Sequence, residues 1–183
     1  TISKPTADIT IADLAALAIK GSIRAETVAQ GENRVSGLAV DFEQQAGRTG
    51  FSVDGKYDGG PLTVKGDLAS AKGRTEIRLA SFGATPKGIA LKLAQPTVIA
   101  IENGTVRLNA LTIQASKGTI AVNGTAGEKL DITAKLNALP AALVNAFAPD
   151  LGAEGTIAGT VDVEGAASAP VVAYDLKWSG ASL

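Results

Sequence analysis

The side chains best able to do chemistry in this chain are its carboxylates, because the sequence contains no histidine and no cysteine. Asp162 and Glu164 are two residues apart in an alternating segment, so both would project from one face of a β-strand. Such a pair could supply the acid and base of a glycoside hydrolase. Charges at alternate positions are also typical of a solvated strand face. We favour that second interpretation, because charge is spread in this way along the whole chain.

Two further patterns resemble known binding loops but lack the residue spacing that those loops require. Asp54, Asp58 and the nearby glycines resemble a calcium loop, but the ligand positions of an EF-hand are missing. Gly152, Gly155 and Gly159 do not open a helix after a strand, as a phosphate-binding loop requires. Without imidazole or thiolate, the usual zinc ligands are absent as well. We therefore expect a non-enzymatic protein with no catalytic residue, no cofactor and no metal site.

The charge balance and hydropathy restrict the possible partners. The chain has 17 basic and 18 acidic residues among 183, a net charge of -1, which argues against nucleic acid as a main partner. No uncharged apolar run reaches the roughly 18 residues that a membrane-spanning helix needs. We interpret the chain as a segment of a longer protein, with any membrane anchor or export signal outside it.

The elements that must position these side chains are strands. Apolar and polar residues alternate in segments 130–137, 157–164 and 172–179, which is the two-residue period of a half-buried strand. Residues 10–19 are compatible with a helix or with two strands, and we favour strands. Glycine dipeptides typical of hairpin turns separate the alternating segments: Asp54-Gly55, Asp58-Gly59, Asn103-Gly104 and Asn123-Gly124. The pattern predicts roughly a dozen strands in a long antiparallel meander with one apolar face.

One segment departs from alternation. Leu139, Leu143 and Phe147 follow one another at intervals of four, and Pro140 and Pro149 fit the start and stop of a helix. We predict a short amphipathic helix near residues 140–147 that covers part of the apolar face as a lid.

The apolar face is the strongest candidate for a functional surface. A second sheet, a closed barrel or a folded-over sheet could each cover it. Aromatic residues make up 4% of the chain, so small side chains would fill the interior incompletely. An incompletely filled interior suits a conduit for an apolar ligand. The side chains that we expect to line it are Val106, Leu108, Ile120, Val122, Leu130, Ile132, Leu136, Ile157, Val161, Val163, Val172, Tyr174, Leu176 and Trp178.

Segments in the C-terminal half resemble the TamB family of Gram-negative bacteria. The family combines a "Leu-Pro…Phe-x-Pro-x-Leu" helix with a "Gly-Thr-x-x-Gly-x-x-x-Val-x-Gly…Pro" strand unit. Matching segments here are 136–140, 147–151, 155–165 and 169–172, and the segments 118–124 and 130–132 resemble the family's strand repeat. The resemblance covers residues 98–183, and further upstream it is compositional.

This resemblance implies an architecture, a location and a function. TamB-like proteins are anchored in the inner membrane and cross the periplasm as a β-taco, a sheet bent into a U with an apolar groove. Residues 1–183 would be a single β-taco segment of such a periplasm-spanning protein. The family is associated with assembly of outer-membrane proteins such as autotransporters, and is grouped with AsmA-like proteins that move phospholipid between membranes. The implied partners are phospholipid acyl chains, unfolded outer-membrane protein strands and, through regions outside this segment, the Omp85-class outer-membrane barrel TamA.

Two other classes of protein remain open. A structural β-solenoid or adhesin segment of a secreted protein would have short parallel strands, whereas the Asn-Gly dipeptides favour antiparallel hairpins. A carbohydrate-active β-helix enzyme would need a cleft of concentrated charge, and the charges here are dispersed.

Overall fold

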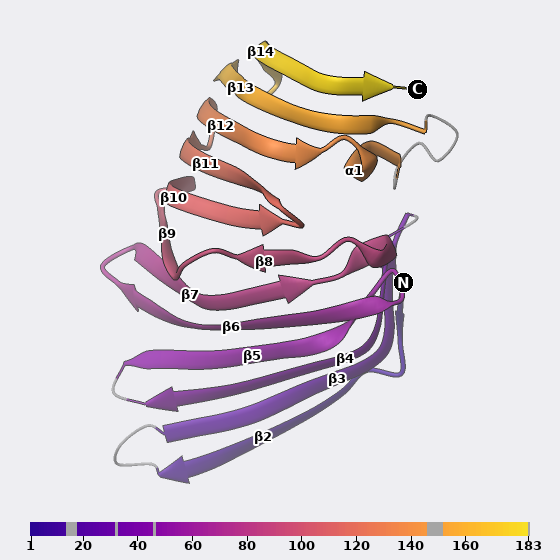
Figure 1. Ribbon diagram of the computed structural model, residues 1–183. Coiled ribbons are helices and arrows are strands. Elements are labelled where there is room, and N and C mark those ends of the chain that lie inside the picture. Colours follow the sequence, from indigo (N-terminus) through magenta and orange to yellow (C-terminus); the bar gives the residue numbers. More distant parts are fainter. Residues whose placement is uncertain (14–17, 32, 46, 146–151, 183) are drawn as a thin grey trace.

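The computed structural model describes residues 1–13, 18–31, 33–45, 47–145 and 152–182, which fold almost entirely into strands (Figure 1). The strands are β1 (Ile2–Ser3), β2 (Thr6–Asp13), β3 (Ala18–Gln30), β4 (Asn33–Gln45), β5 (Arg48–Tyr57), β6 (Gly60–Ala71), β7 (Arg74–Ala84), β8 (Leu91–Leu93), β9 (Thr97–Glu102), β10 (Thr105–Ala115), β11 (Gly118–Ala126), β12 (Lys129–Pro140), β13 (Glu154–Ala166) and β14 (Ala169–Ser182). Two short helical elements interrupt them: the 3₁₀ turn η1 (Pro86–Gly88) and the helix α1 (Ala142–Asn145).

All 14 strands belong to one antiparallel sheet, in which neighbours in sequence are mostly neighbours in space. At one end, β1 and β2 both pair with β3, and near the middle β8 and β9 share one position between β7 and β10. The strands stack in chain order from β2 to β14, and the long strands β3 and β4 curve along their length (Figure 1). The predicted all-β antiparallel meander is therefore confirmed.

Two of the predicted turns occur where expected. Asp58 and Gly59 connect β5 to β6 with φ angles of 46° and 83°, and Asn103 and Gly104 connect β9 to β10 with 49° and 73°. Positive φ at both central residues is the geometry of a type I′ hairpin, whose twist matches that of the flanking strands.

Two other predicted turns are wrong, because the dipeptides lie inside strands. Asp54-Gly55 belongs to β5, where Gly55 lies opposite a register shift in β4. Asn123-Gly124 belongs to β11, and the amide Oδ1 of Asn123 accepts a hydrogen bond from the backbone N–H of Ala110 at 2.6 Å. Gly124 has φ of +127°, and a Cβ there would lie 1.9 Å from the carbonyl oxygen of Asp131. Here glycine permits close approach of two strands instead of a chain reversal.

The predicted lid helix begins later than expected. Helix α1 spans Ala142–Asn145, and Leu143, which it contains, is half-buried. Leu139 and Pro140 are the last residues of β12, so placing them in the helix was wrong: they pair with Ile157 and Thr156 of β13. Pairing with β13 and burial of Leu139, which is 8% exposed, stabilise the strand more than the i, i+4 apolar spacing stabilises a helix. Phe147 lies outside the described residues, so its role as a lid residue stays a prediction.

The buried apolar residues are small. Among the described residues, no large side chain is completely buried, and six of the eight buried apolar residues are alanines: Ala25, Ala84, Leu93, Ala100, Ala115, Leu139, Ala141 and Ala153. An ordinary β-sandwich buries large side chains between two layers. Apart from Leu93 and Leu139, the large apolar side chains described in this sheet are partly open to solvent.

Candidate apolar binding face

The register of the strands brings the candidate lining residues together. Residues directly opposite each other in an antiparallel ladder project to the same side of the sheet. Ile120 pairs with Leu136, and Val161 pairs with Tyr174, so each pair shares a face. Following such cross-strand partners from β10 to β14 shows that all 14 candidate residues lie on one side of the sheet, which we call the apolar face.

Five cross-strand rows make up this face in the C-terminal half. Each row is nearly free of polar side chains, because the strands keep the same alternation and the register shifts preserve its phase. In order along the strands, the rows are Val106–Ala126–Leu130–Gly165–Pro170, Leu108–Gly124–Ile132–Val163–Val172, Leu111–Val122–Ala134–Val161–Tyr174, Ile113–Ile120–Leu136–Gly159–Leu176, and Leu139–Ile157–Trp178.

Exposure of the apolar face rises toward the C-terminal edge. Side chains on β10 to β13 are half-buried, whereas Val172, Tyr174, Leu176 and Trp178 are 55%, 73%, 44% and 40% exposed. Among the described strands, β14 pairs with β13 alone, which leaves these side chains with fewer neighbours. The Trp178 indole N–H donates to the carbonyl oxygen of Glu154 at 2.7 Å, which holds the ring against β13 while its face stays open.

The apolar face continues through the N-terminal half of the sheet, which our candidate residues omitted. One row there crosses from β3 to β7: Ile23–Val40–Val53–Val64–Phe82. Ile99 of β9 pairs with both Ile77 and Leu108, so this region joins the C-terminal rows. The signal was present in the sequence, since residues 51–53 and 62–65 alternate in the same way.

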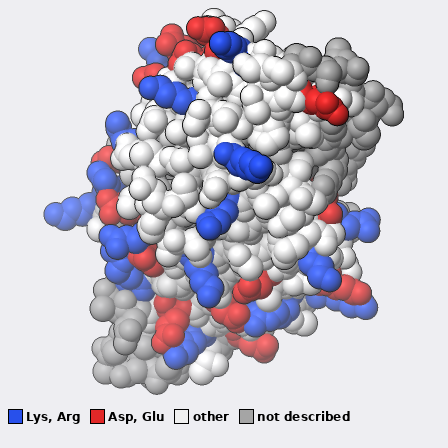
Figure 2. Space-filling view, viewed as in Figure 1, with Lys and Arg blue, Asp and Glu red and all other residues white. Residues whose placement is uncertain are grey.

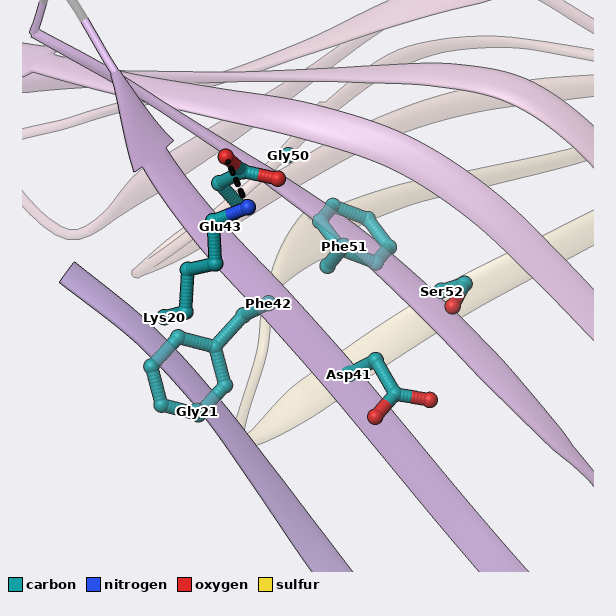
Figure 3. Close-up of a pocket in the computed structure, with 8 residues that line it drawn as sticks. All are labelled: Lys20, Gly21, Asp41, Phe42, Glu43, Gly50, Phe51 and Ser52. Atoms are coloured by element: carbon teal, nitrogen blue, oxygen red, sulfur yellow. Dashed lines mark ion pairs between the residues drawn. The ribbon is translucent and has the colours of Figure 1, made fainter. Parts of the chain in front are cut away.

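A row with two phenylalanines and two glycines crosses the N-terminal half. Gly21, Phe42, Phe51 and Gly66 are successive cross-strand partners on β3 to β6. Figure 3 shows the Phe42 ring lying over Gly21, where a Cβ would come within 2.3 Å of the ring. Each ring thus covers the backbone of a glycine on the next strand, an arrangement that protects otherwise exposed strand backbone. A hollow of about 410 Å³ is lined by Gly21, Phe42 and Phe51 together with residues that alternate with them along β3 to β5 and belong to the opposite face: Lys20, Asp41, Glu43, Gly50 and Ser52.

A second hollow lies where the middle strand position is split between β8 and β9. Pro96 has no N–H to donate to a ladder, so the chain leaves the sheet between β8 and β9. Thr97 is 6% exposed, and its hydroxyl donates to the carbonyl oxygen of Asn109 at 2.9 Å, next to the register shift of β10. The hollow, about 580 Å³, is lined by Phe82, Leu91 and their neighbours.

The opposite face carries the charges. Lys20 pairs with Glu43 at 2.9 Å, and Arg24 pairs with Asp41 at 2.7 Å, both across the β3–β4 ladder. These side chains are well exposed, so each pair contributes at most about 1 kcal/mol. Figure 2 shows charged side chains over the lower strands, along the left margin and at the top of the view, with few near its centre.

The carboxylates considered as a glycosidase pair lie on this charged face. Asp162 pairs with Thr133 and accepts a hydrogen bond from its hydroxyl at 2.6 Å, and Glu164 pairs with Asp131. Their location separates them from the apolar face and from both hollows. Among the described residues, no group of three acidic side chains is placed to hold a metal ion.

The described helices include none that is long and apolar enough to cross a bilayer. Comparison of the chain with protein-family models, curated proteins and solved structures finds no match. The apolar face is therefore the feature from which function must be argued.

Proposed function

We propose that this chain is a non-enzymatic segment that shields long apolar chains, above all the acyl chains of phospholipid, along its apolar face. The observation that carries the proposal is the partial exposure of that face. Apolar residues form rows across the whole width of the sheet, yet none of the large apolar side chains described is completely buried. Exposed apolar area of this extent marks a surface that functions with something bound to it.

The dimensions of the face favour a chain-like ligand over a compact one. Twelve successive strand positions run along the sheet, and strands lie about 4.8 Å apart, so the face extends over roughly 55 Å. A small-molecule site is instead an enclosed cavity with a few convergent polar groups. A continuous apolar strip with charges confined to the other face suits acyl chains, whose polar headgroups can remain in water.

Repeated register shifts support a folded-over sheet. They occur in the ladders β2–β3, β4–β5, β6–β7, β10–β11, β12–β13 and β13–β14. Such bulges bend a strand and increase its twist. We propose that this bending forms the U-shaped β-taco of a TamB-like protein, with the apolar face lining the groove. In that setting the segment would lie in the periplasm and serve phospholipid transport or assembly of outer-membrane proteins.

The strand directions argue against a structural β-solenoid, the alternative considered from the sequence. Coils of a parallel β-helix stack parallel strands. Every strand pair described here is antiparallel.

The test compares two aspartates at adjacent residues of β11. Val122 lies on the apolar face between Leu111 and Ala134, whereas Ala121 lies on the charged face between Thr112 and Lys135. We expect Val122→Asp to weaken binding of a fluorescent long-chain fatty acid about tenfold, because an acyl chain would have to cover a carboxylate. Ala121→Asp should bind like the wild type, since its carboxylate meets Lys135. Far-UV circular dichroism and thermal melting establish that both variants are folded.

A third variant keeps the test decisive if Val122→Asp unfolds. Tyr174 lies on the apolar face but is 73% exposed, so Tyr174→Asp costs little stability. It should nevertheless weaken binding of the fatty acid. Absence of binding to the wild type, or equal loss in Ala121→Asp, would overturn the proposal.

A further inference from the structure

The second hollow is a gap within the sheet itself. It has a volume of about 580 Å³ and opens where β7 and β8 separate. Residues 80–82 of β7 pair with neither β8 nor β9, although β7 pairs with β8 on one side of them and with β9 on the other. The link 94–96 stays with β10, since the Ala94 N–H donates to the carbonyl oxygen of Thr112 at 2.9 Å. Strand backbone therefore bounds the gap and holds its walls in place.

Four side-chain hydrogen-bond donors line this gap. They belong to four different segments: Thr63 to β6, Ser81 to β7, Lys92 to β8 and Gln95 to the link. All four side chains are exposed, and within the described part of the chain none of them forms a hydrogen bond or an ion pair. A Cβ on Gly83, which lies between Thr63 and Lys92 in the ladders, would be 3.2 Å from the Thr63 hydroxyl oxygen. Glycine therefore keeps the space between these two donors open.

The surroundings of the gap are basic. Lys56 and Lys65 are cross-strand partners of lining residues on β6 and β7. Among the described residues, no acidic side chain forms an ion pair with either of them or with Lys92. One acid, Asp54, lies opposite Thr63. An excess of basic side chains around a hollow raises the local concentration of anions, so the gap should attract an anionic ligand.

The donors fit a phosphate ester better than a carboxylate. Lysine binds phosphate as a point charge, and hydroxyl and amide groups can donate to the remaining oxygens. A phosphate group presents oxygens in several directions, whereas a carboxylate presents two in one plane, so donors from four segments match phosphate better. The volume of the gap is within the range of roughly 300–1,000 Å³ that is typical of small-molecule sites, which leaves room for the esterified group.

We propose that the gap between β7 and β8 is a binding site for a small phosphate ester, in which the Lys92 ammonium and the hydroxyls of Thr63 and Ser81 donate to the phosphate oxygens. A soluble polyol phosphate and the glycerol phosphate of a lipid headgroup share this chemistry. These donors belong to the charged face, so the site does not depend on the proposed binding of acyl chains to the apolar face.

Glycerol 1-phosphate is the probe, because it has the phosphate ester and no acyl chain. We expect isothermal titration calorimetry at low ionic strength to show binding to the wild type and none of glycerol itself. Lys92→Ala should raise the dissociation constant about tenfold, because the phosphate loses its charged donor. Lys135→Ala is the matched control and should bind like the wild type. Lys135 is an exposed lysine of the same face, between Ala121 and Thr160 in the ladders and distant from the gap.

Gly83→Val tests the location of the site without changing its charge. The added side chain would occupy the space between Thr63 and Lys92, so binding of glycerol 1-phosphate should be lost. Far-UV circular dichroism and thermal melting establish whether the variant is folded. Ser81→Ala keeps the test decisive if Gly83→Val unfolds, because it removes an exposed hydroxyl and should raise the dissociation constant about fivefold.

Vesicles of phosphatidylglycerol distinguish the two sources of the ester. If the ligand is a lipid headgroup, the vesicles should compete with glycerol 1-phosphate for the wild type and bind Lys92→Ala less. If the ligand is a soluble ester, the vesicles should leave binding of glycerol 1-phosphate unchanged. Absence of glycerol 1-phosphate binding to the wild type, equal loss in Lys92→Ala and Lys135→Ala, or full binding by a folded Gly83→Val would each overturn the proposal. Failure of the wild type to bind fatty acid would instead overturn only the proposed function.

Discussion

At the scale of single residues, some glycines in this protein allow two strands to approach closely. Gly124 and Gly159 have φ of +127° and +143° inside strands, and a Cβ at either would lie about 2 Å from a carbonyl oxygen of the neighbouring strand. Both lie in the rows of the apolar face. The two glycines carry no side chain because neighbouring backbone occupies the space, and the apolar face is therefore flatter at these positions.

The first prediction concerns Gly124. Gly124→Ala should lower the free energy of unfolding by at least about 2 kcal/mol, because alanine adds a backbone clash to an unfavourable φ. Urea unfolding measured by circular dichroism tests it. Gly50→Ala is the matched control: the added Cβ would lie 3.8 Å from the nearest atom, the carbonyl oxygen of Glu43. The control should change stability by less than about 1 kcal/mol. Similar losses in the two variants would contradict our account of Gly124.

At the scale of elements, the bend of β10 depends on a side chain from the next strand. Ala110 has φ of +52° at the register shift, which leaves its N–H outside the regular ladder. The side-chain oxygen of Asn123 on β11 accepts a hydrogen bond from that N–H, while the hydroxyl of Thr97 on β9 donates one to the carbonyl oxygen of Asn109. Strands on both sides therefore satisfy the polar backbone that the bulge exposes, which makes the bend a stable feature of the sheet.

The second prediction follows from this arrangement. Asn123→Ala should destabilise the protein by about 1 kcal/mol and speed hydrogen exchange at the Ala110 amide, because the donor loses its acceptor. Gln114→Ala, an exposed position on β10, should leave exchange at Ala110 unchanged. Hydrogen exchange followed by NMR distinguishes the two. Unaltered exchange at Ala110 in Asn123→Ala would show that the bulge is held by other contacts.

At the scale of the whole molecule, one side of the sheet is apolar and remains open. The ion pairs and the Thr133–Asp162 hydrogen bond lie on the other side, where water screens them. Most of the stabilisation must then come from the strand ladders and from contacts between neighbouring side chains within each face. Such a protein resembles half of a β-sandwich whose second layer is supplied by what it binds.

The third prediction tests this openness directly. The native protein should enhance the fluorescence of 8-anilinonaphthalene-1-sulfonate while its far-UV dichroism remains that of a folded β-protein, because the dye binds exposed apolar surface. Fatty acid should displace the dye in proportion to its own binding. Dye fluorescence that rises only when urea unfolds the protein would indicate a closed apolar interior.

Alternation along the chain was sufficient to predict the sheet, the antiparallel meander and which side chains share a face. The reason is physical: the side-chain period of a strand is two, so a correct phase assigns every residue of a strand to one side. The residue at which the helix α1 begins could not be predicted from alternation. The i, i+4 spacing beginning at Leu139 is local, whereas pairing of Leu139 with Ile157 depends on a strand 18 residues away in sequence.

The clearest contrast between sequence and tertiary structure is a repeated tripeptide. Asn-Gly-Thr occurs at residues 103–105 and again at 123–125. By itself the sequence determined that both sites favour positive φ, since asparagine and glycine tolerate it. Asn103-Gly104 makes a hairpin turn, whereas Asn123-Gly124 continues a strand. Tertiary structure decided between these outcomes, because the unpaired N–H of Ala110 on β10 and the approaching backbone of Asp131 on β12 surround the second site and hold it extended.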